Sequence, residues 1–137
     1  MTGDSQTGGA SGGPQTWSDP DELARLSLRD QEGVTVAQLS GEVDISNAGA
    51  IAGRLTELPN LAHGLIVDLG GVEYLDSTAI ALLHELAARL RRRSQRLIVV
   101  CPPDCAPRRV LELTALDTTI PVLDELAPAI ATLRATD

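Results

Sequence analysis

Two short apolar runs with a helical stretch between them constrain the fold of this chain more than any other feature. Gly64–Leu69 and Leu97–Val100 are almost continuously apolar, which is typical of strands covered on both faces of a sheet. Between them, apolar residues recur at helical spacing from Ile80 to Leu90. A strand, a helix and a strand within this length predict a right-handed βαβ unit, and hence an α/β protein.

The segments on either side of this unit predict an element order of ββαβαβαβα. Val34–Ser40 alternates apolar and polar residues after the turn Asp30–Gly33, so it is expected to pair in an antiparallel hairpin with the strand that carries Leu26 and Leu28. The other expected elements are a helix near residues 47–58, a helix from 107, a short edge strand near 120–122 and a last helix near 126–133.

The first twenty residues differ from the rest in composition. They are rich in Gly, Ser, Thr, Gln and Pro, and Trp17 is their only aromatic side chain. Such a segment buries too little apolar surface to offset the entropy lost on ordering, so residues 1–20 are predicted to be a disordered tail before one domain, 21–137. The start of the chain has no basic region or apolar run typical of a signal peptide, so a cytoplasmic location is expected.

The charge of the chain argues against two classes of partner. The formal net charge is −8 and the isoelectric point is near 4.6, whereas nucleic acids and anionic membranes reward a positive surface. We therefore expect no nucleic-acid binding and no direct insertion into a membrane. The arginines of Arg89–Arg96 are interpreted as a solvated helix end. Cys101 and Cys105 are interpreted as structural thiols, with a regulatory disulfide as the alternative.

The segment that stands out chemically is Val72–Ile80, which is expected to leave a buried strand through a loop and to open the long helix. Ligand contacts in open α/β sheets lie at this edge. The first turn of a helix also offers unpaired N–H groups and partial positive charge to an oxyanion. Spacing alone favours a simpler interpretation, in which Asp76 or Ser77 merely caps the helix.

Three motifs resemble the STAS domain of anti-sigma factor antagonists. They are Gly41–Asp44 after the second strand, Ile66–Leu69 in the third, and Val72–Thr78 before the long helix. The resemblance runs from about Leu23 to Leu133. It implies a STAS-like mixed sheet with an antiparallel N-terminal hairpin, parallel central strands and flanking helices.

The same resemblance implies a function and a site. In the family, a hydroxyl residue after Asp-Ser is phosphorylated by a partner that is both an anti-sigma factor and an ATP-dependent serine/threonine kinase. By motif position this residue is Thr78, with Ser77 as the alternative, and the partner-binding residues are Asp44, Asp76, Ser77, Thr78 and Ala79. The protein would then free a sigma factor until it is phosphorylated, and a phosphatase would reset it.

Two other functions stay open at this point. STAS modules also act as unphosphorylated scaffolds or as accessory subunits of lipid transporters, and Ala79, where the family usually has glycine, keeps this alternative. A small enzyme that uses Asp44, Asp68 or Asp76 as acid or base would lack a paired nucleophile, a metal cluster and a cofactor loop. We therefore expect no enzymatic activity, no catalytic residues, no metal and no cofactor.

Overall fold

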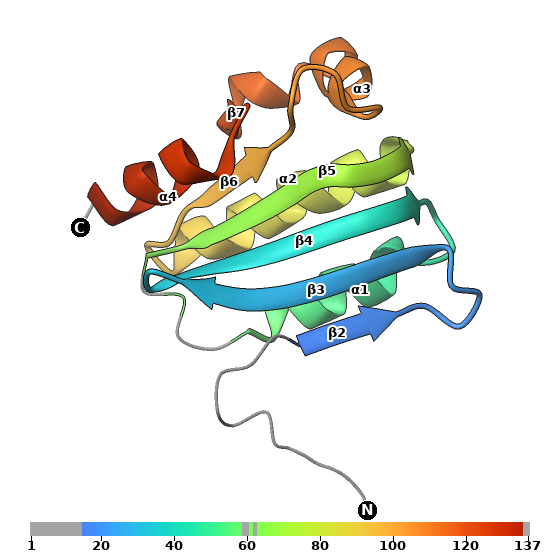
Figure 1. Ribbon diagram of the computed structural model, residues 1–137, viewed down its shortest axis with the longest axis horizontal. Helices are drawn as coiled ribbons and strands as arrows, with labels where there is room; N and C mark the ends of the chain where they lie inside the picture. The colour runs from blue at the N-terminus through green and yellow to red at the C-terminus, as the bar shows by residue number, and fades with distance from the viewer. Residues whose placement is uncertain (1–14, 59–60, 62, 136–137) are drawn as a thin grey trace, which may run out of the picture.

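A six-stranded mixed sheet forms the centre of the protein (Figure 1). The computed structural model describes residues 15–58, 61 and 63–135. The strands lie in the order in which they occur in the chain, with β2 next to β3 and so on to β7. Both β2–β3 and β3–β4 are antiparallel, and the other pairs are parallel, which confirms the predicted fold class. The strands are β2 (Gln15–Ser18), β3 (Ala24–Gln31), β4 (Val34–Val43), β5 (Leu65–Leu75), β6 (Leu97–Val100) and β7 (Val122–Leu123).

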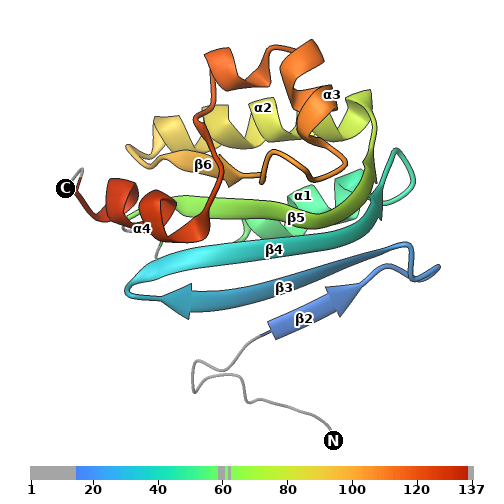
Figure 2. The same ribbon diagram turned by 45° about the horizontal axis from the view of Figure 1, so that its top comes forward.

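Helices cover both faces of this sheet. They are α1 (Ala48–Thr56), α2 (Ser77–Arg92), α3 (Arg108–Leu113), the 3-10 helix η1 (Leu116–Thr118) and α4 (Leu126–Ala135). In Figure 2, α4 lies on the near side of the sheet and α1 and α2 lie behind it. The larger hydrophobic core is on the α1 and α2 side, and a smaller one joins α4 to β4, β5 and β6. Among the described residues, no helix is both long and apolar enough to cross a membrane.

The predicted hairpin between β3 and β4 is confirmed. Its two turn residues, Glu32 and Gly33, both have positive φ, at 56° and 85°. Positive φ at both central residues is the signature of the tight turn whose twist matches that of paired strands. The apolar residues of β4 then fall on alternate faces of the sheet, so that Val36 packs on the α4 side and Ala37 on the α1 side.

The N-terminal segment differs from the prediction. Residues 15–18, which were expected to belong to a disordered tail, form strand β2 and pair with β3. Trp17 packs against the larger core, and the Arg54 guanidinium lies 5.2 Å from the centre of its ring. One aromatic side chain and an available strand edge thus order a segment that composition alone marks as polar. Residues 1–14 of the predicted tail lie outside the described residues.

Strand β5 is longer than its apolar run indicates. Gly70 and Gly71 favour a loop by composition, yet the pairing with β4 continues past them to Val43 and Leu75. Irregularities in the register absorb the extra residues, and Val72 and Leu75 are buried. The loop expected before α2 is therefore absent, and Asp76 alone joins β5 to α2.

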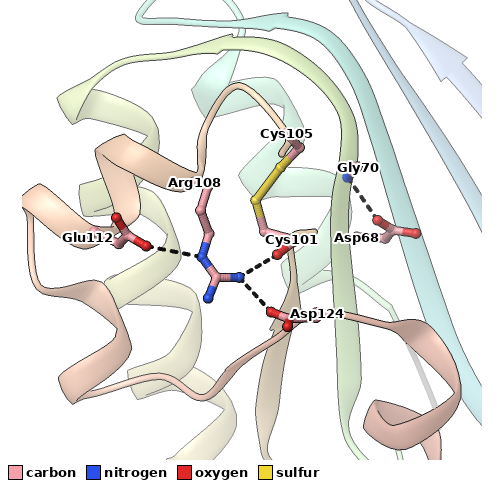
Figure 3. The surroundings of a disulfide bond; sticks show 7 residues. All are labelled: Asp68, Gly70, Cys101, Cys105, Arg108, Glu112 and Asp124. Carbon is pink, nitrogen blue, oxygen red and sulfur yellow. Dashed lines mark hydrogen bonds and ion pairs between the residues drawn. A yellow bond between two sulfur atoms is a disulfide. The ribbon is translucent and has the colours of Figure 1, made fainter. Parts of the chain in front are cut away.

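The two cysteines form a disulfide after β6 (Figure 3). This corrects their interpretation as free structural thiols, and a regulatory role for the disulfide stays a prediction. Cys101 is fully buried, and its carbonyl oxygen accepts a hydrogen bond of 2.6 Å from the Arg108 guanidinium. The same guanidinium forms ion pairs with Glu112 and Asp124. The disulfide and Arg108 thus fasten α3 to the ends of β6 and β7.

Candidate functional site

Two neighbouring strands end side by side and bring two of the predicted site residues together. Val43 and Leu75 are register partners at the ends of β4 and β5. Asp44 and Asp76 follow them directly, and the Asp76 amide donates a hydrogen bond of 3.3 Å to the Val43 carbonyl oxygen. Because β4 and β5 are parallel, both residues lie at the carboxyl edge of the sheet. Figure 1 shows this edge on the right, where β4 and β5 end.

Asp76 is the N-cap of α2. Its Oδ1 accepts hydrogen bonds from the backbone N–H groups of Thr78 (3.0 Å) and Ala79 (3.2 Å). A cap of this kind stabilises a helix by about 0.5–2 kcal/mol. The capping interpretation of Asp76 is therefore confirmed, and the cap also fixes the direction in which the first turn of α2 presents its side chains.

The three residues after Asp76 differ sharply in exposure. Ser77 is exposed, Thr78 is half-buried, and Ala79 is only 2% exposed. Within residues 15–58, 61 and 63–135, neither the Ser77 nor the Thr78 hydroxyl makes a hydrogen bond. Both hydroxyls are thus available at a helix N-terminus, where partial positive charge favours an added anion.

The exposure of Ala79 corrects one prediction. Its methyl group packs in the larger core, beside Val43 and Leu83, so it does not contribute to a partner-binding surface. The first turn of α2 is rotated so that this position points inward. Ala79 in place of the family's glycine was the reason to keep the unphosphorylated alternative, and because the Ala79 side chain is buried, its methyl group does not obstruct an approaching partner.

Asp44 lies in a compact turn of its own. Its Oδ1 accepts hydrogen bonds from the backbone N–H and the hydroxyl of Ser46, at 2.9 and 2.6 Å. The hydrogen bond from the Ser46 hydroxyl is the larger cause, and the one from the Ser46 backbone N–H the smaller, of a pKa of Asp44 below its ordinary value. Asp44 is thus a firmly ionised carboxylate beside the start of α2. It does not cap α1, because the N-cap position belongs to Asn47.

Exposed apolar side chains surround these polar groups. Ile45 is 77% exposed, Tyr74 is 52% exposed and Leu23 is 37% exposed. Tyr74 is paired with Glu42 across β4 and β5, and the Leu23 carbonyl oxygen accepts a hydrogen bond from the Glu42 amide. All three lie at the carboxyl edge, whereas Leu113, the other exposed large apolar residue of the described chain, belongs to α3.

We call the residues at this edge the carboxyl-edge surface: Leu23, Asp44, Ile45, Tyr74, Asp76 and Ser77. Exposed apolar side chains framed by charged groups are typical of surfaces that bind other proteins. Our sequence reasoning missed Ile45 and Tyr74. The available signal was one large apolar residue directly after the Gly41–Asp44 motif and one aromatic residue within the Val72–Thr78 motif, which is too weak to separate an exposed side chain from a core one.

Asp68, the third aspartate considered above, is not part of this surface, and neither is His84. The Asp68 carboxylate accepts a hydrogen bond of 2.8 Å from the Gly70 amide and lies near the disulfide (Figure 3). His84 shares a hydrogen bond with Thr119. No group of three or more His, Cys, Asp or Glu side chains in the described part of the chain is placed to hold a metal ion.

The mixed sheet, the capped helix and the two aspartates after neighbouring strand ends define a class of protein, a small α/β domain in which a helix with an exposed serine in its first turn begins at the carboxyl edge of the sheet. Comparison with known protein families agrees, since residues 25–131 match the STAS domain. The chain therefore belongs to the STAS domain family, which confirms the resemblance that its motifs indicated.

Several relatives carry the name of anti-sigma factor antagonist. A crystal structure of an anti-sigma factor antagonist from Mycobacterium paratuberculosis is 31% identical, covers 86% of this chain and 99% of its own, and has a TM-score of 0.72. The anti-sigma-F factor antagonist RsfB of Mycobacterium tuberculosis is 26% identical over 85% of this chain and 94% of its own. The Bacillus cell fate determinant SpoIIAA in its phosphorylated form shares the fold at 20% identity, with a TM-score of 0.58 over 80% of this chain and 99% of its own.

Proposed function

We propose that this protein is an anti-sigma factor antagonist, which binds a kinase-type anti-sigma factor through the carboxyl-edge surface and thereby releases a sigma factor. One observation carries the proposal. An exposed residue with a hydroxyl, Ser77, directly follows the Asp76 cap at the N-terminus of α2, at the sheet edge that also holds Asp44 and the exposed Ile45 and Tyr74. The names of the Mycobacterium relatives support the same role.

Phosphorylation of the Ser77–Thr78 pair ends the binding in this proposal. The kinase transfers the γ-phosphoryl group of ATP to the side-chain oxygen, so that a new O–P bond forms, ADP leaves and the hydroxyl proton is lost. Motif position favours Thr78, whereas exposure favours Ser77, because Ser77 is exposed and Thr78 is half-buried. We therefore expect the phosphate on one of these two residues, with Ser77 the more accessible acceptor.

The charge balance of the site explains why a phosphate would release the partner. A phosphate adds about −1.5 to −2 charges at neutral pH. The N-terminus of α2 stabilises this charge, so the fold is expected to survive modification. A bound partner, however, would have to bury the phosphate beside the Asp76 and Asp44 carboxylates, and a loss of about 1.4 kcal/mol already weakens binding tenfold.

The proposal assigns no chemistry to the protein itself. ATP and the phosphoryl transfer belong to the kinase, and removal of the phosphate belongs to a phosphatase. The protein supplies the hydroxyl, the cap that orients it and the apolar contacts around it. It acts as a binding module rather than as an enzyme.

The test is a set of pull-downs against each kinase-type anti-sigma factor of the source genome, with and without ATP, followed by mass mapping of phosphate. We expect one anti-sigma factor to bind without ATP, and to phosphorylate the wild type but not the Ser77→Ala/Thr78→Ala double variant. Thr132→Ala on α4, far from the carboxyl edge, is the matched control and should behave as the wild type. Capture by no anti-sigma factor, or phosphate at neither residue, would contradict the proposal.

A further inference from the structure

Two polar side chains are buried beside the carboxyl-edge surface and contact each other. Among the described residues, Asp19 (6% exposed) and Asn47 (1% exposed) are the buried polar or charged ones. The Asn47 Nδ2 donates a hydrogen bond of 3.1 Å to the Asp19 Oδ2, although the two residues are 28 positions apart in the chain. Burial of polar groups costs free energy unless each finds a partner, so this pair needs an explanation.

Asp19 organises the connection between β2 and β3. Its Oδ1 accepts hydrogen bonds from the backbone N–H groups of Leu23 (2.7 Å) and Ala24 (3.4 Å). This connection lies at the same edge of the sheet as the ends of β4 and β5 (Figure 1). The carboxylate therefore joins the N-terminal strand, which composition marked as a tail, to the carboxyl edge.

Asn47 holds the loop between β4 and α1. Its Nδ2 also donates to the Glu42 carbonyl oxygen at 2.9 Å, and its Oδ1 accepts from the Asp44 amide at 3.1 Å. Asn47 stands at the N-cap position of α1, yet its side chain makes no hydrogen bond to the first turn of that helix. An asparagine at this position usually caps the helix. Here the side chain is used to hold the loop instead.

We infer that Asn47, braced by Asp19, is a positioning residue that presents Asp44 and Ile45 to the partner. The inference takes the identity of the partner from the proposed function. The hydrogen bonds from which it is argued do not depend on that function. Without the Asn47 side chain, the Asp44 amide and the Asp19 carboxylate each lose a buried hydrogen-bond partner. The loop would then sample other conformations, and Ile45, which is 77% exposed, would leave the position in which the loop presents it to the partner.

The first arm of the test needs no partner. Hydrogen exchange of the Asp44 amide is measured in the full-length wild type, in Asn47→Ala and in Ile130→Ala, whose side chain lies in the smaller core on the opposite face. We expect Asn47→Ala to raise the exchange rate of the Asp44 amide by about tenfold or more, and Ile130→Ala to leave it within about twofold at a temperature where all three proteins are folded. Unchanged protection in Asn47→Ala would overturn the inference.

The second arm measures the affinity for the anti-sigma factor that the wild type captures. We expect a loss of about tenfold for Asn47→Ala, and less than twofold for Ile130→Ala. The Asp19→Ala/Asn47→Ala double variant should lose less binding free energy than the sum of the losses of the two single variants, since the two side chains share a hydrogen bond. Equal affinities of Asn47→Ala and Ile130→Ala would contradict the inference while the proposed function stands.

Two further outcomes are distinguishable. If Asn47→Ala does not fold, Asp19→Asn replaces it, because this change places a donor opposite the Asn47 Nδ2 and leaves Leu23 and Ala24 an acceptor. If the wild type captures no anti-sigma factor, the proposed function fails, and the exchange of the Asp44 amide still decides whether Asn47 positions the loop.

Discussion

The Asp76 side chain accepts two hydrogen bonds and also places a negative charge at the N-terminus of α2. Replacement of Asp76 separates these two contributions to stability. In Asp76→Ala, the backbone N–H groups of Thr78 and Ala79 lose their acceptor, and the N-terminus of α2 loses a negative charge. Loss of the cap costs about 0.5–2 kcal/mol and loss of the charge about 0.3–1 kcal/mol. We therefore expect the free energy of unfolding to fall by about 1–2 kcal/mol, because both effects act on one helix end.

Asp76→Asn is the informative companion variant. It keeps a side-chain oxygen for the two N–H groups and removes only the charge, so its free energy of unfolding should fall by about 0.5 kcal/mol. Asp104→Ala removes an exposed carboxylate that makes no hydrogen bond in the described structure and serves as the control for net charge.

The assay is urea unfolding followed by circular dichroism at constant pH and salt, with the slope of the free energy against urea compared between variants. An unfolding free energy of Asp76→Ala equal to that of the wild type would refute the capping argument. An equal loss in Asp76→Ala and Asp76→Asn would show that charge, and not the hydrogen bonds, is what the helix end requires.

Three other perturbations test separate parts of the site. Ser46→Ala should raise the pKa of Asp44 toward its ordinary value in an NMR titration, and an unchanged pKa would contradict the assigned cause. Because that pKa is lowered on folding, the stability it contributes is present above the ordinary pKa of about 3.9 and is lost as the pH falls through the folded value. Gly41→Ala should lower the free energy of unfolding by more than about 1 kcal/mol, since Gly41 has φ of +87° and a Cβ there would collide with the Leu23 carbonyl oxygen. Thermal melting measures this loss, and an unchanged Tm would contradict it. Ile45→Asp should weaken binding of the anti-sigma factor by about tenfold or more without lowering the Tm, and full affinity would exclude Ile45 from the interface.

The parts of the fold that the sequence predicted are those in which local pattern and tertiary packing agree. The hairpin, the parallel strands β5 and β6 and the helix between them follow from periodicity, because each buried face repeats at the spacing of its element. The short β7 was also expected at an edge, since Pro121 cannot donate to a ladder.

The parts that the sequence did not predict depend on contacts between distant segments. In strand β2, Trp17 packs against the core and contacts Arg54. Neither contact can be predicted from the polar composition of this segment. The continuation of β5 through Gly70 and Gly71 depends on pairing with β4, which overrides two residues that favour a loop.

The candidate site shows the same division. The positions of Asp44 and Asp76 at adjacent strand ends follow from motif order and the rule for parallel sheets. The burial of Ala79 does not, because the rotation of the first turn of α2 is set by the Asp76 cap and the core beneath it. The sequence places Asn47 at the start of α1, where an asparagine usually caps the helix, but its side chain instead contacts Asp19, and only the folded chain brings these two segments together.

We propose that one phosphate at the start of α2 separates the protein from its anti-sigma factor. The most direct measurement is isothermal titration calorimetry of one purified anti-sigma factor with the unmodified protein and with the same protein after phosphorylation. We expect the phosphorylated protein, which should still be folded by circular dichroism, to bind the anti-sigma factor at least about tenfold more weakly than the unmodified protein does. Equal dissociation constants for the two forms would contradict it.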